Sequence, residues 1–386
     1  MSDLSYIDKL LDGVEVEWKA LGEISEYSKT RISHELLNKA NYIGVNNLLQ
    51  NRAGKTESDH VPVAGNSTKY QNDDILIGNI RPYLKKIWLA NNTGGTNGDV
   101  LVIRLTNNTV NPRFLFQVLA DDKFFNYNMQ HAKGAKMPRG DKTKIMDYCI
   151  PIPPLKIQNK IVQILDKFAE LTAELTAELT ARQQQYAYYR DQLLTFGERD
   201  VEWMPLGDIA ENLDSKRKPI TSSLREPGDI PYYGASGIVD YVKDYIFDGD
   251  YLLISEDGAN LIARNTPIAF SISGKNWVNN HAHVLKFETY AERKYVEYYL
   301  NSIDLTPYIS GAAQPKLNQK NLNSIKIPNP SLEEKKRIVS ILDKFDTLTT
   351  SLTEGLPREI ELRQQQYEYY RDLLLSFPKP EVVAHD

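Results

Sequence analysis

The sequence predicts an α+β fold in which two globular domains of mixed α/β structure are separated by two long antiparallel helices that pair as a coiled coil. Three observations support this. Two helical segments are near copies of each other, the stretches beside them hardly match, and those stretches contain short apolar runs typical of strands. Residues 182–196 (RQQQYAYYRDQLLTF) and 363–377 (RQQQYEYYRDLLLSF) are identical at 12 of 15 positions. The fold therefore has a pseudo-twofold internal repeat.

The copy extends upstream of these segments. Residues 150–168 match residues 327–345 at 11 of 19 positions, at a slightly smaller offset along the chain. Each half of the chain also opens on the same phrase, Val-Glu-Trp, at residues 16–18 and again at residues 201–203. A chain of this kind has one constant task and one variable task, and it performs each of them twice.

Composition is that of a globular chain of two or three domains. The 386 residues are 41% hydrophobic and 25% charged, with no apolar run long enough to span a membrane, and we expect no secretion signal at the N-terminus. The single cysteine, Cys149, excludes an internal disulfide framework and a cysteine-based zinc site. We expect a cytoplasmic protein, because a reducing compartment suits a chain with one thiol.

The repeat predicts the limits of the domains. We assign residues 1–150 to a first variable domain, 151–200 to a central helical spacer, 201–330 to a second variable domain, 331–378 to a C-terminal helical spacer and 379–386 to a tail. The elements expected to correspond in the two domains are strands at 75–77 and 251–254, strands at 100–103 and 282–285, short helices at 113–119 and 294–300, and polar loops at 134–144 and 311–320.

The repeated segments are predicted to be helices. Apolar residues from Ile157 to Phe196 recur at three- and four-residue steps, which places one apolar stripe along one face. No glycine or proline interrupts residues 155–196, so this segment can form one continuous helix of ~60 Å. The second copy contains Gly355 and Pro357. We expect a kink or break there, because proline lacks a backbone donor and clashes with the preceding turn.

The first helix contains a four-residue repeat, Thr-Ala-Glu-Leu, whose units end at Leu175 and Leu179, and an approximate third unit ends at Leu171. Four residues turn a helix by ~400° and advance it by ~6 Å, so one unit can be added or removed while leucine stays near the same face. This segment predicts a spacer of adjustable length. The two helices also differ in length, because the segment 169–181 corresponds to the longer segment 346–362.

None of the motifs that carry catalysis or metal binding is complete. Residues 54–56 (GKT) lack the first glycine of a phosphate-binding loop, and residues 111–112 (NP) lack the second proline of an amino-methyltransferase motif and are expected to start a helix. His281 and His283 should point the same way from a predicted strand, as a polar face or as a DNA-facing pair, without a third metal ligand. Residues 256–257 (Glu-Asp) are expected in a turn. We predict no catalytic residue, no cofactor site and no metal site.

Loops rich in basic and amide side chains are the candidates for DNA binding, because cations neutralise phosphates and base edges need paired donors and acceptors. Two such loops lie at equivalent positions of the repeat, and further clusters lie at residues 216–218 and 81–86. The net charge of −5 by itself argues against nucleic-acid binding, but basic clusters can still gather on one face. The candidate DNA-binding residues are Lys133, Lys136, Arg139, Lys142, Lys144, Lys216, Arg217, Lys218, Lys316, Gln319 and Lys320.

Two dissimilar domains that alternate with near-identical helices, the Thr-Ala-Glu-Leu spacer and the RQxQYxYYRDxLL helix ends resemble the specificity subunit of a type I restriction-modification enzyme, most closely the type IC branch. The resemblance covers essentially the whole chain. It implies two target recognition domains, each of which reads one half of an asymmetric, bipartite site in double-stranded DNA. The helices would set the spacing of the halves and dock two modification subunits, which are adenine methyltransferases. Restriction subunits, which are ATP-driven motors with a nuclease, would join that core.

The resemblance also implies a non-catalytic subunit with no cofactor of its own. S-adenosylmethionine, ATP and Mg²⁺ would bind to the partner subunits, and no membrane partner is expected. The main alternative is a non-DNA scaffold whose two domains bind partner proteins, which the acidic balance of the second domain favours. A third hypothesis, a single-chain restriction and methylation enzyme, is contradicted by the missing catalytic motifs.

Overall fold

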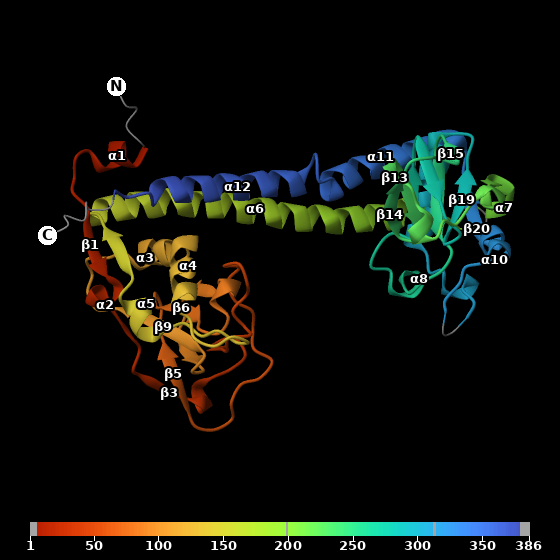
Figure 1. Ribbon diagram of the computed structural model, residues 1–386. Coiled ribbons are helices and arrows are strands. Elements are labelled where there is room, and N and C mark those ends of the chain that lie inside the picture. The colour runs from red at the N-terminus through yellow and green to blue at the C-terminus, as the bar shows by residue number, and fades with distance from the viewer. Residues whose placement is uncertain (1–5, 198–199, 312–313, 379–386) are drawn as a thin grey trace. The chain divides into compact units, whose positions relative to one another are not determined.

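A computed structural model of the chain describes residues 6–197, 200–311 and 314–378, and the expected tail at 379–386 lies outside them. The chain divides into two compact units (Figure 1). Unit 1 joins the segment that ends at Glu174 to the segment that begins at Ile360, and unit 2 runs from Leu175 to Glu359. In the described ranges, no helix is both long enough and apolar enough to cross a membrane.

Unit 1 contains two four-stranded sheets. The first is formed, in spatial order, by β2 (Ser25–Tyr27), β9 (Val100–Leu105), β6 (Ile75–Gly78) and β7 (Ile87–Leu89). The second is formed by β3 (Arg31–Ser33), β5 (Asn66–Tyr70), β8 (Gly94–Thr96) and β4 (Tyr42–Ile43). Side chains alternate along β9, so Leu101 and Ile103 pack in the core beneath the helices, while Val100 and Val102 pack in the core shared with the second sheet.

The helices of unit 1 pack with the first sheet in one apolar core. They are α1 (Tyr6–Leu11), α2 (Leu21–Ile24), α3 (Pro112–Leu119), α4 (Asp122–Gln130) and α5 (Lys142–Met146). The 3₁₀ turn η1 (His34–Leu36) follows β3 of the second sheet, and η2 (Pro82–Leu84) lies between β6 and β7. Asn111 caps α3, because its side chain accepts a hydrogen bond from Arg113 N at 2.8 Å and Pro112 fills the first turn. The predicted helix start at Asn111 is confirmed.

Unit 2 repeats this plan. Its first sheet is β12 (Glu211–Asn212), β19 (Ala282–Lys286), β16 (Tyr251–Ser255) and β17 (Ala269–Ile272), and its second is β14 (Gly237–Val242), β13 (Pro227–Gly234), β18 (Lys275–Val278) and β15 (Phe247–Asp248). Its helices and turns are α7 (Leu206–Ile209), α8 (Asn260–Ala263), α9 (Tyr290–Ser302), α10 (Gln319–Ser324), η3 (Asp214–Lys216), η4 (Ser222–Leu224) and η5 (Thr306–Tyr308). Along β16, Leu252 and Ile254 pack in the core with α9, while Leu253 packs between the sheets.

A two-stranded antiparallel sheet joins the beginning and the end of each variable domain. In unit 1, β1 (Glu17–Ala20) pairs with β10 (Cys149–Ile152), so Trp18 lies opposite Pro151. In unit 2, β11 (Glu202–Pro205) pairs with β20 (Lys326–Asn329), so Trp203 lies opposite Pro328. The repeated Val-Glu-Trp phrase therefore begins the same structural element in both units.

The repeated segments form long helices, as predicted. Helix α6 (Leu155–Leu194) is continuous over 40 residues and ends slightly before the expected limit. The second copy is broken into α11 (Leu332–Thr350) and α12 (Leu356–Leu374), and Gly355 between them has a φ of +83°. The expected break is confirmed. The leucines of the four-residue repeat are half-buried, whereas the alanines and glutamates of its units are exposed.

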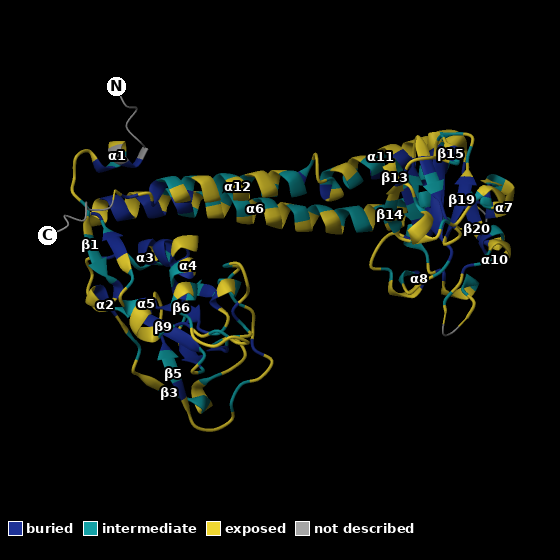
Figure 2. Cartoon of the chain, viewed as in Figure 1, coloured by how far each residue is buried: buried dark blue, intermediate teal, exposed yellow. Residues whose placement is uncertain are grey.

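An equivalent aromatic contact packs the long helices together in each unit. In unit 1, Phe168 of α6 stacks on Tyr370 of α12 with ring centroids 5.1 Å apart. In unit 2, Phe345 of α11 stacks on Tyr189 of α6 with centroids 5.8 Å apart. The first half of α6 thus packs on the second half of α12, which makes the pair antiparallel. Figure 2 shows that buried residues gather in the sheets, whereas the long helices carry many exposed residues.

We predict that Ile161→Ala and Ile338→Ala each destabilise the unit in which the residue lies by about 2–5 kcal/mol, because both side chains are fully buried at equivalent positions of the repeat. Hydrogen exchange resolved by residue measures the loss in each unit. Gln163→Ala on the exposed face of α6 is the control and should change stability by less than about 0.5 kcal/mol. A loss below about 1 kcal/mol for either isoleucine would contradict the packing.

Candidate functional site

Each unit carries a short hairpin that leads into a capped helix. In unit 1 the hairpin spans residues 133–139, and Lys133 and Arg139 exchange two backbone hydrogen bonds of 2.9 Å. In unit 2 it spans residues 310–316, and Ser310 and Lys316 exchange backbone bonds of 2.9 and 2.8 Å. Residues 312–313 lie outside the described residues. The two hairpins occupy the positions of the two polar loops that the sequence singled out.

The hairpin of unit 1 is clamped to the end of β6. Arg139 forms an isolated bridge with Ile80, and Gly140 donates its N–H to the carbonyl of Asn79 at 3.2 Å. Gly140 allows this close approach, because a Cβ there would collide with the side chains of Asn128 and Asn79. The hairpin is therefore fixed beside the end of β6 in the first sheet.

The hairpin of unit 2 is clamped in the same way to the end of β16. Lys316 forms an isolated bridge with Asp257, and Leu317 donates its N–H to the carbonyl of Glu256 at 2.8 Å. The paired strands place Ile254 opposite His283, as Ile77 lies opposite Leu101 in unit 1. The backbone framework of the two sites is thus equivalent, although the side chains on it differ.

Both predicted loops end as short helices. Asp141 caps α5 by accepting hydrogen bonds from Thr143 N at 3.0 Å and Lys144 N at 3.3 Å, and Asn318 caps α10 by accepting from Asn321 N at 2.9 Å. The loop expected at 134–144 is helical from Lys142, and the loop expected at 311–320 is helical from Gln319. The capping residue sets both helix starts.

The candidate cations of unit 1 fall into two groups. Three of them form ion pairs: Lys133 with Asp141 at 2.7 Å, Arg139 with Asp99 at 2.7 Å, and Lys144 with Asp147 at 3.0 Å. The hydrogen bond from the Lys133 side chain holds the pKa of Asp141 below its usual value. Lys136 and Lys142 are exposed, and within the part of the chain that the structure describes their side chains have no hydrogen bond or ion pair.

Arg81 joins this site, although the sequence placed it in a separate cluster. Its backbone N–H donates to the carbonyl of Pro138 in the hairpin at 2.7 Å, and its side chain is exposed. The φ of Arg81 is +52°, in the left-handed region that non-glycine residues rarely adopt. The other cations of that cluster are engaged elsewhere, since Lys85 contacts Asp122 and Lys86 contacts the carbonyl of Val45, both at 2.8 Å.

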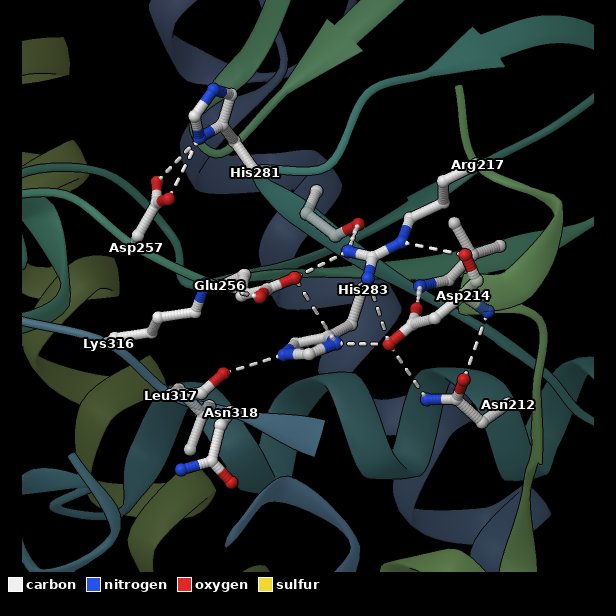
Figure 3. A network of polar contacts seen from close by, with 12 residues as sticks. Asn212, Asp214, Arg217, Glu256, Asp257, His281, His283, Lys316, Leu317 and Asn318 are labelled. Carbon is white, nitrogen blue, oxygen red and sulfur yellow. Dashed lines mark hydrogen bonds and ion pairs between the residues drawn. The ribbon is translucent and has the colours of Figure 1, made fainter. Parts of the chain in front are cut away.

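In unit 2 the cluster at residues 216–218 and the hairpin meet at one carboxylate (Figure 3). Glu256 lies 2.6 Å from Arg217 Nη1 and 3.0 Å from Lys316 Nζ, and Arg217 Nη2 lies 3.3 Å from Asp214. Arg217 is largely buried by these contacts, whereas Lys216, Lys218, Gln319 and Lys320 are exposed. The structure thus brings together two segments that lie far apart in the sequence.

The prediction that His281 and His283 form one polar or DNA-facing pair is wrong. Strand β19 begins at Ala282, and His283 is completely buried in contact with Asp214 and the carbonyl of Leu317. His281 precedes the strand, is exposed and hydrogen-bonds to Asp257 at 2.8 Å. The two histidines therefore belong to separate networks, as Figure 3 shows.

Glu256 was expected in a turn without further role, and the structure makes it part of a charged core. Burial favours a higher pKa for Asp214 and Glu256, but hydrogen bonds and nearby cations outweigh it and hold both pKa values below their usual range. For Asp214 the main opposing contact is His283, and for Glu256 it is Arg217, followed by Lys316. Both carboxylates are therefore ionised at neutral pH.

Asp214, Glu256 and His283 also place one ligand atom each within 4.8 Å of one another. This spacing by itself is compatible with a metal ion. The carboxylates are already paired with Arg217 and Lys316, however, and a divalent ion would have to displace both cations. The arrangement therefore fits an internal ionic network better than a metal centre.

Comparison with known proteins identifies the family. A family model described as the type I restriction modification DNA specificity domain matches residues 13–182 and 198–362. The chain belongs to this family. It is 36% identical to the EcoR124I/EcoR124II specificity subunit of Escherichia coli, with 100% of both chains covered. It is 34% identical to the putative type I specificity subunit S.HindORF215P of Haemophilus influenzae, with 97% of this chain and 98% of the relative covered.

The fold agrees with the family. A chain from a solved structure of the type I restriction-modification system, studied for complex assembly and conformational transition, superposes with a TM-score of 0.62 and 18% identity. The match covers 94% of this chain and 98% of that chain. The predicted fold of two mixed α/β domains, long antiparallel helices and an internal repeat is thus confirmed.

The function follows from the family. A specificity subunit is a non-catalytic component of a type I restriction-modification system, and its role is DNA recognition. The alternative of a non-DNA scaffold finds no support among these relatives. Sequence reasoning located the two loops at which the hairpins lie. It placed Arg81 in a separate basic cluster and did not predict its contact with the hairpin, and it missed the burial of His283.

We predict that acid weakens unit 2 through Asp214. Because its folded pKa lies below the unfolded value of about 4, its stabilisation is complete above about pH 4 and is lost as the pH falls through the folded pKa. Urea unfolding between pH 6 and pH 3 should show a smaller loss of stability in the double variant Asp214→Asn/His283→Gln, which removes the carboxylate together with the ring that pairs with it, because unfolding of the wild type takes up about one more proton. Ser340→Ala, on the exposed face of α11, removes no titratable group and should keep the wild-type slope; an unchanged slope in the double variant would refute the assignment.

Proposed function

We propose that each unit reads one half of an asymmetric, bipartite site in double-stranded DNA, and that its hairpin, together with the start of the helix that follows it, is the main reading element. The observation that carries this proposal is the pair of hairpins clamped by equivalent backbone hydrogen bonds but equipped with different side chains. Because the backbones of the two hairpins are equivalent, each unit can approach DNA in the same way, and because their side chains differ, each unit can prefer different bases. The target recognition domains are assigned to residues 1–150 and 201–330.

The exposed cations and amides are proposed to make the direct contacts. A side chain that has no ion-pair partner within the protein can bind a phosphate or a base edge without first breaking an ion pair. The direct contacts are assigned to Lys136, Lys142, Lys216, Lys218, Gln319 and Lys320, with Arg81 added. Lys133, Arg139, Lys144 and Lys316 are ion-paired yet about half exposed or more, so they can exchange a carboxylate for a phosphate. Arg217 is assigned a supporting role, because its side chain is 13% exposed.

The helical spacers, assigned to residues 151–200 and 331–378, are proposed to dock two modification subunits, which are adenine methyltransferases. The support is the repetition of exposed side chains, which no internal packing requires. Tyr188 is 62% exposed and Tyr369, its counterpart, is 65% exposed. Asp191 and Asp372 are likewise exposed and correspond to each other. Two similar surfaces on one chain suit two copies of one partner.

The remaining parts of the system are assigned by family membership. Restriction subunits would add ATP-dependent cleavage, and S-adenosylmethionine, ATP and Mg²⁺ would bind to the partner subunits rather than to this chain. We assign the chain to the type IC branch on its Thr-Ala-Glu-Leu spacer, and to the cytoplasm, where the DNA and the partners are found. The relative from Escherichia coli, which aligns over its full length, supports membership of a type I system.

The direct contacts can be tested one unit at a time. Methylation mapping in cells that contain the chain and its partner subunits identifies the site. Lys136→Ala in unit 1 and Lys320→Ala in unit 2 should each weaken binding of the assembled complex to that duplex about 3- to 10-fold at ~0.1 M salt. Each should also reduce the slope of log K against log salt by about 0.9, because each removes one phosphate contact.

Lys326→Ala, which removes an exposed cation from β20, is the matched control and should leave affinity and salt slope unchanged. If the complex shows no sequence-selective binding, the proposed function fails. If binding is selective but neither Lys136→Ala nor Lys320→Ala differs from the control, only the assignment of the contacts fails.

Deletion of residues 176–179 tests the division of labour between helices and domains. One unit of the four-residue repeat corresponds to ~6 Å of helix, so the gap between the half-sites should change by about one or two base pairs at about 3.4 Å each. The half-site sequences should stay the same, because neither hairpin is altered. Methylation mapping of the deletion variant reads out both quantities. Altered half-site sequences would contradict the proposal.

A further inference from the structure

His283 is the buried centre of the ionic network at the base of the second hairpin (Figure 3). It lies on β19 with a relative exposure of 0%, between Asp214 of η3 and the backbone of Leu317. Its Nδ1 lies 2.5 Å from Asp214 Oδ2, and its Nε2 lies 2.7 Å from the carbonyl oxygen of Leu317. The ring therefore connects the core of unit 2 to the residue that follows the hairpin.

Both ring nitrogens of His283 have to donate hydrogen bonds. A carbonyl oxygen can only accept, so the nitrogen that faces Leu317 carries a proton. Asp214 is ionised, because its other oxygen accepts the N–H of Val284 at 2.9 Å and Arg217 Nη2 lies 3.3 Å away. The nitrogen that faces Asp214 therefore carries a proton as well. With both nitrogens protonated, His283 is an imidazolium cation.

The charged groups around His283 come from three segments of unit 2. Asp214 and Arg217 come from η3 and its end, Glu256 follows β16, and Lys316 ends the hairpin. Glu256 Oε2 lies 3.9 Å from His283 Nδ1. Nearby, His281 and Asp257 form a separate, exposed pair. The network thus contains three cationic groups, on His283, Arg217 and Lys316, and two carboxylates, on Asp214 and Glu256. Each carboxylate contacts cations when the ring of His283 is charged.

Unit 1 lacks this arrangement. The position that corresponds to His283 is Leu101, which packs in the apolar core. Glu256 corresponds to Asn79, and the cation of the hairpin, Arg139, pairs with Asp99 at 2.7 Å instead. The first hairpin therefore rests on backbone hydrogen bonds and on one half-exposed ion pair, whereas the second is also held by a buried cation.

We propose that His283 is a positioning residue for DNA recognition by unit 2. As an imidazolium it donates a hydrogen bond to the carbonyl of Leu317, and the N–H of Leu317 donates to the carbonyl of Glu256. These two bonds fix the end of the hairpin. They also fix the start of α10, which carries Gln319 and Lys320. This inference rests on the proposed function of the hairpin. Because unit 1 has leucine at this position, only the half-site read by unit 2 depends on the histidine.

The first test compares half-sites in the full chain assembled with its methyltransferase partners, on a duplex whose site is known from methylation mapping. His283→Gln keeps a polar side chain but cannot carry the charge. We expect it to reduce discrimination against base changes in the half-site of unit 2 at least tenfold, about 1.4 kcal/mol. Discrimination in the other half-site should stay within about twofold, and His60→Gln, at an exposed histidine of unit 1, should leave both unchanged.

Equal discrimination by wild type and His283→Gln in the half-site of unit 2, or an equal loss in both half-sites, would overturn the proposal. Absence of sequence-selective binding by the wild type would refute the proposed function first, and this inference with it. The two failures are therefore distinguishable.

A second measurement separates positioning through a charged ring from a merely structural role. In ¹⁵N NMR of the full chain, with His283→Gln to assign the signal, both ring nitrogens of His283 should resonate as protonated nitrogens. Asp214→Asn removes the anionic acceptor, so it should convert the ring to a neutral tautomer and cause the same half-site loss. It also serves as the second variant if His283→Gln does not fold. A neutral ring in the wild type, or full discrimination by Asp214→Asn, would overturn the proposal.

Discussion

The packing of each repeated helix on its own variable domain is the interaction on which the rest of the molecule depends. Ile161 and Leu165 of α6 are fully buried in the core of unit 1, and Ile338 and Leu342 of α11 are fully buried in the core of unit 2. Burial of this size contributes several kcal/mol in each unit and has no directional requirement. It anchors every reading element to a helix whose surface is nearly the same in both halves.

Polar contacts then orient each variable domain on the helix to which apolar burial has attached it, and these contacts differ between the units. The aspartate that follows the buried Leu165 is Asp166 in unit 1, where it pairs with Arg113 at 2.5 Å. Its counterpart, Asp343, accepts hydrogen bonds from Tyr298 at 2.6 Å and from Tyr290 at 2.9 Å. Burial first, and then the hydrogen bond to Asp343, raise the pKa of Tyr290 to about 12. One aspartate position therefore accommodates two domain surfaces that carry different side chains.

The sequence predicted most of the fold because its signals are local and repeated. Strands β6 and β16, the helix start at Asn111 and the break near Gly355 each follow from a short pattern of apolar, capping or turn residues. The site was predicted less well, because its contacts join distant segments. The alternation rule placed His281 and His283 on one strand face, yet the strand begins at Ala282. Nothing local to Arg217 or Glu256 indicates that they meet a hairpin cation.

The two-stranded sheets at the base of each domain have a consequence for how such chains diversify. Because β1 pairs with β10, and β11 with β20, the chain enters and leaves each variable domain through neighbouring antiparallel strands. A domain built in this way can be replaced as a cassette when the incoming domain keeps the apolar surface that packs on the flanking helix. Because the helix segments are similar in the two halves, one such surface serves at both places in the chain. New combinations of half-sites can therefore arise by exchanging whole domains at these sheets.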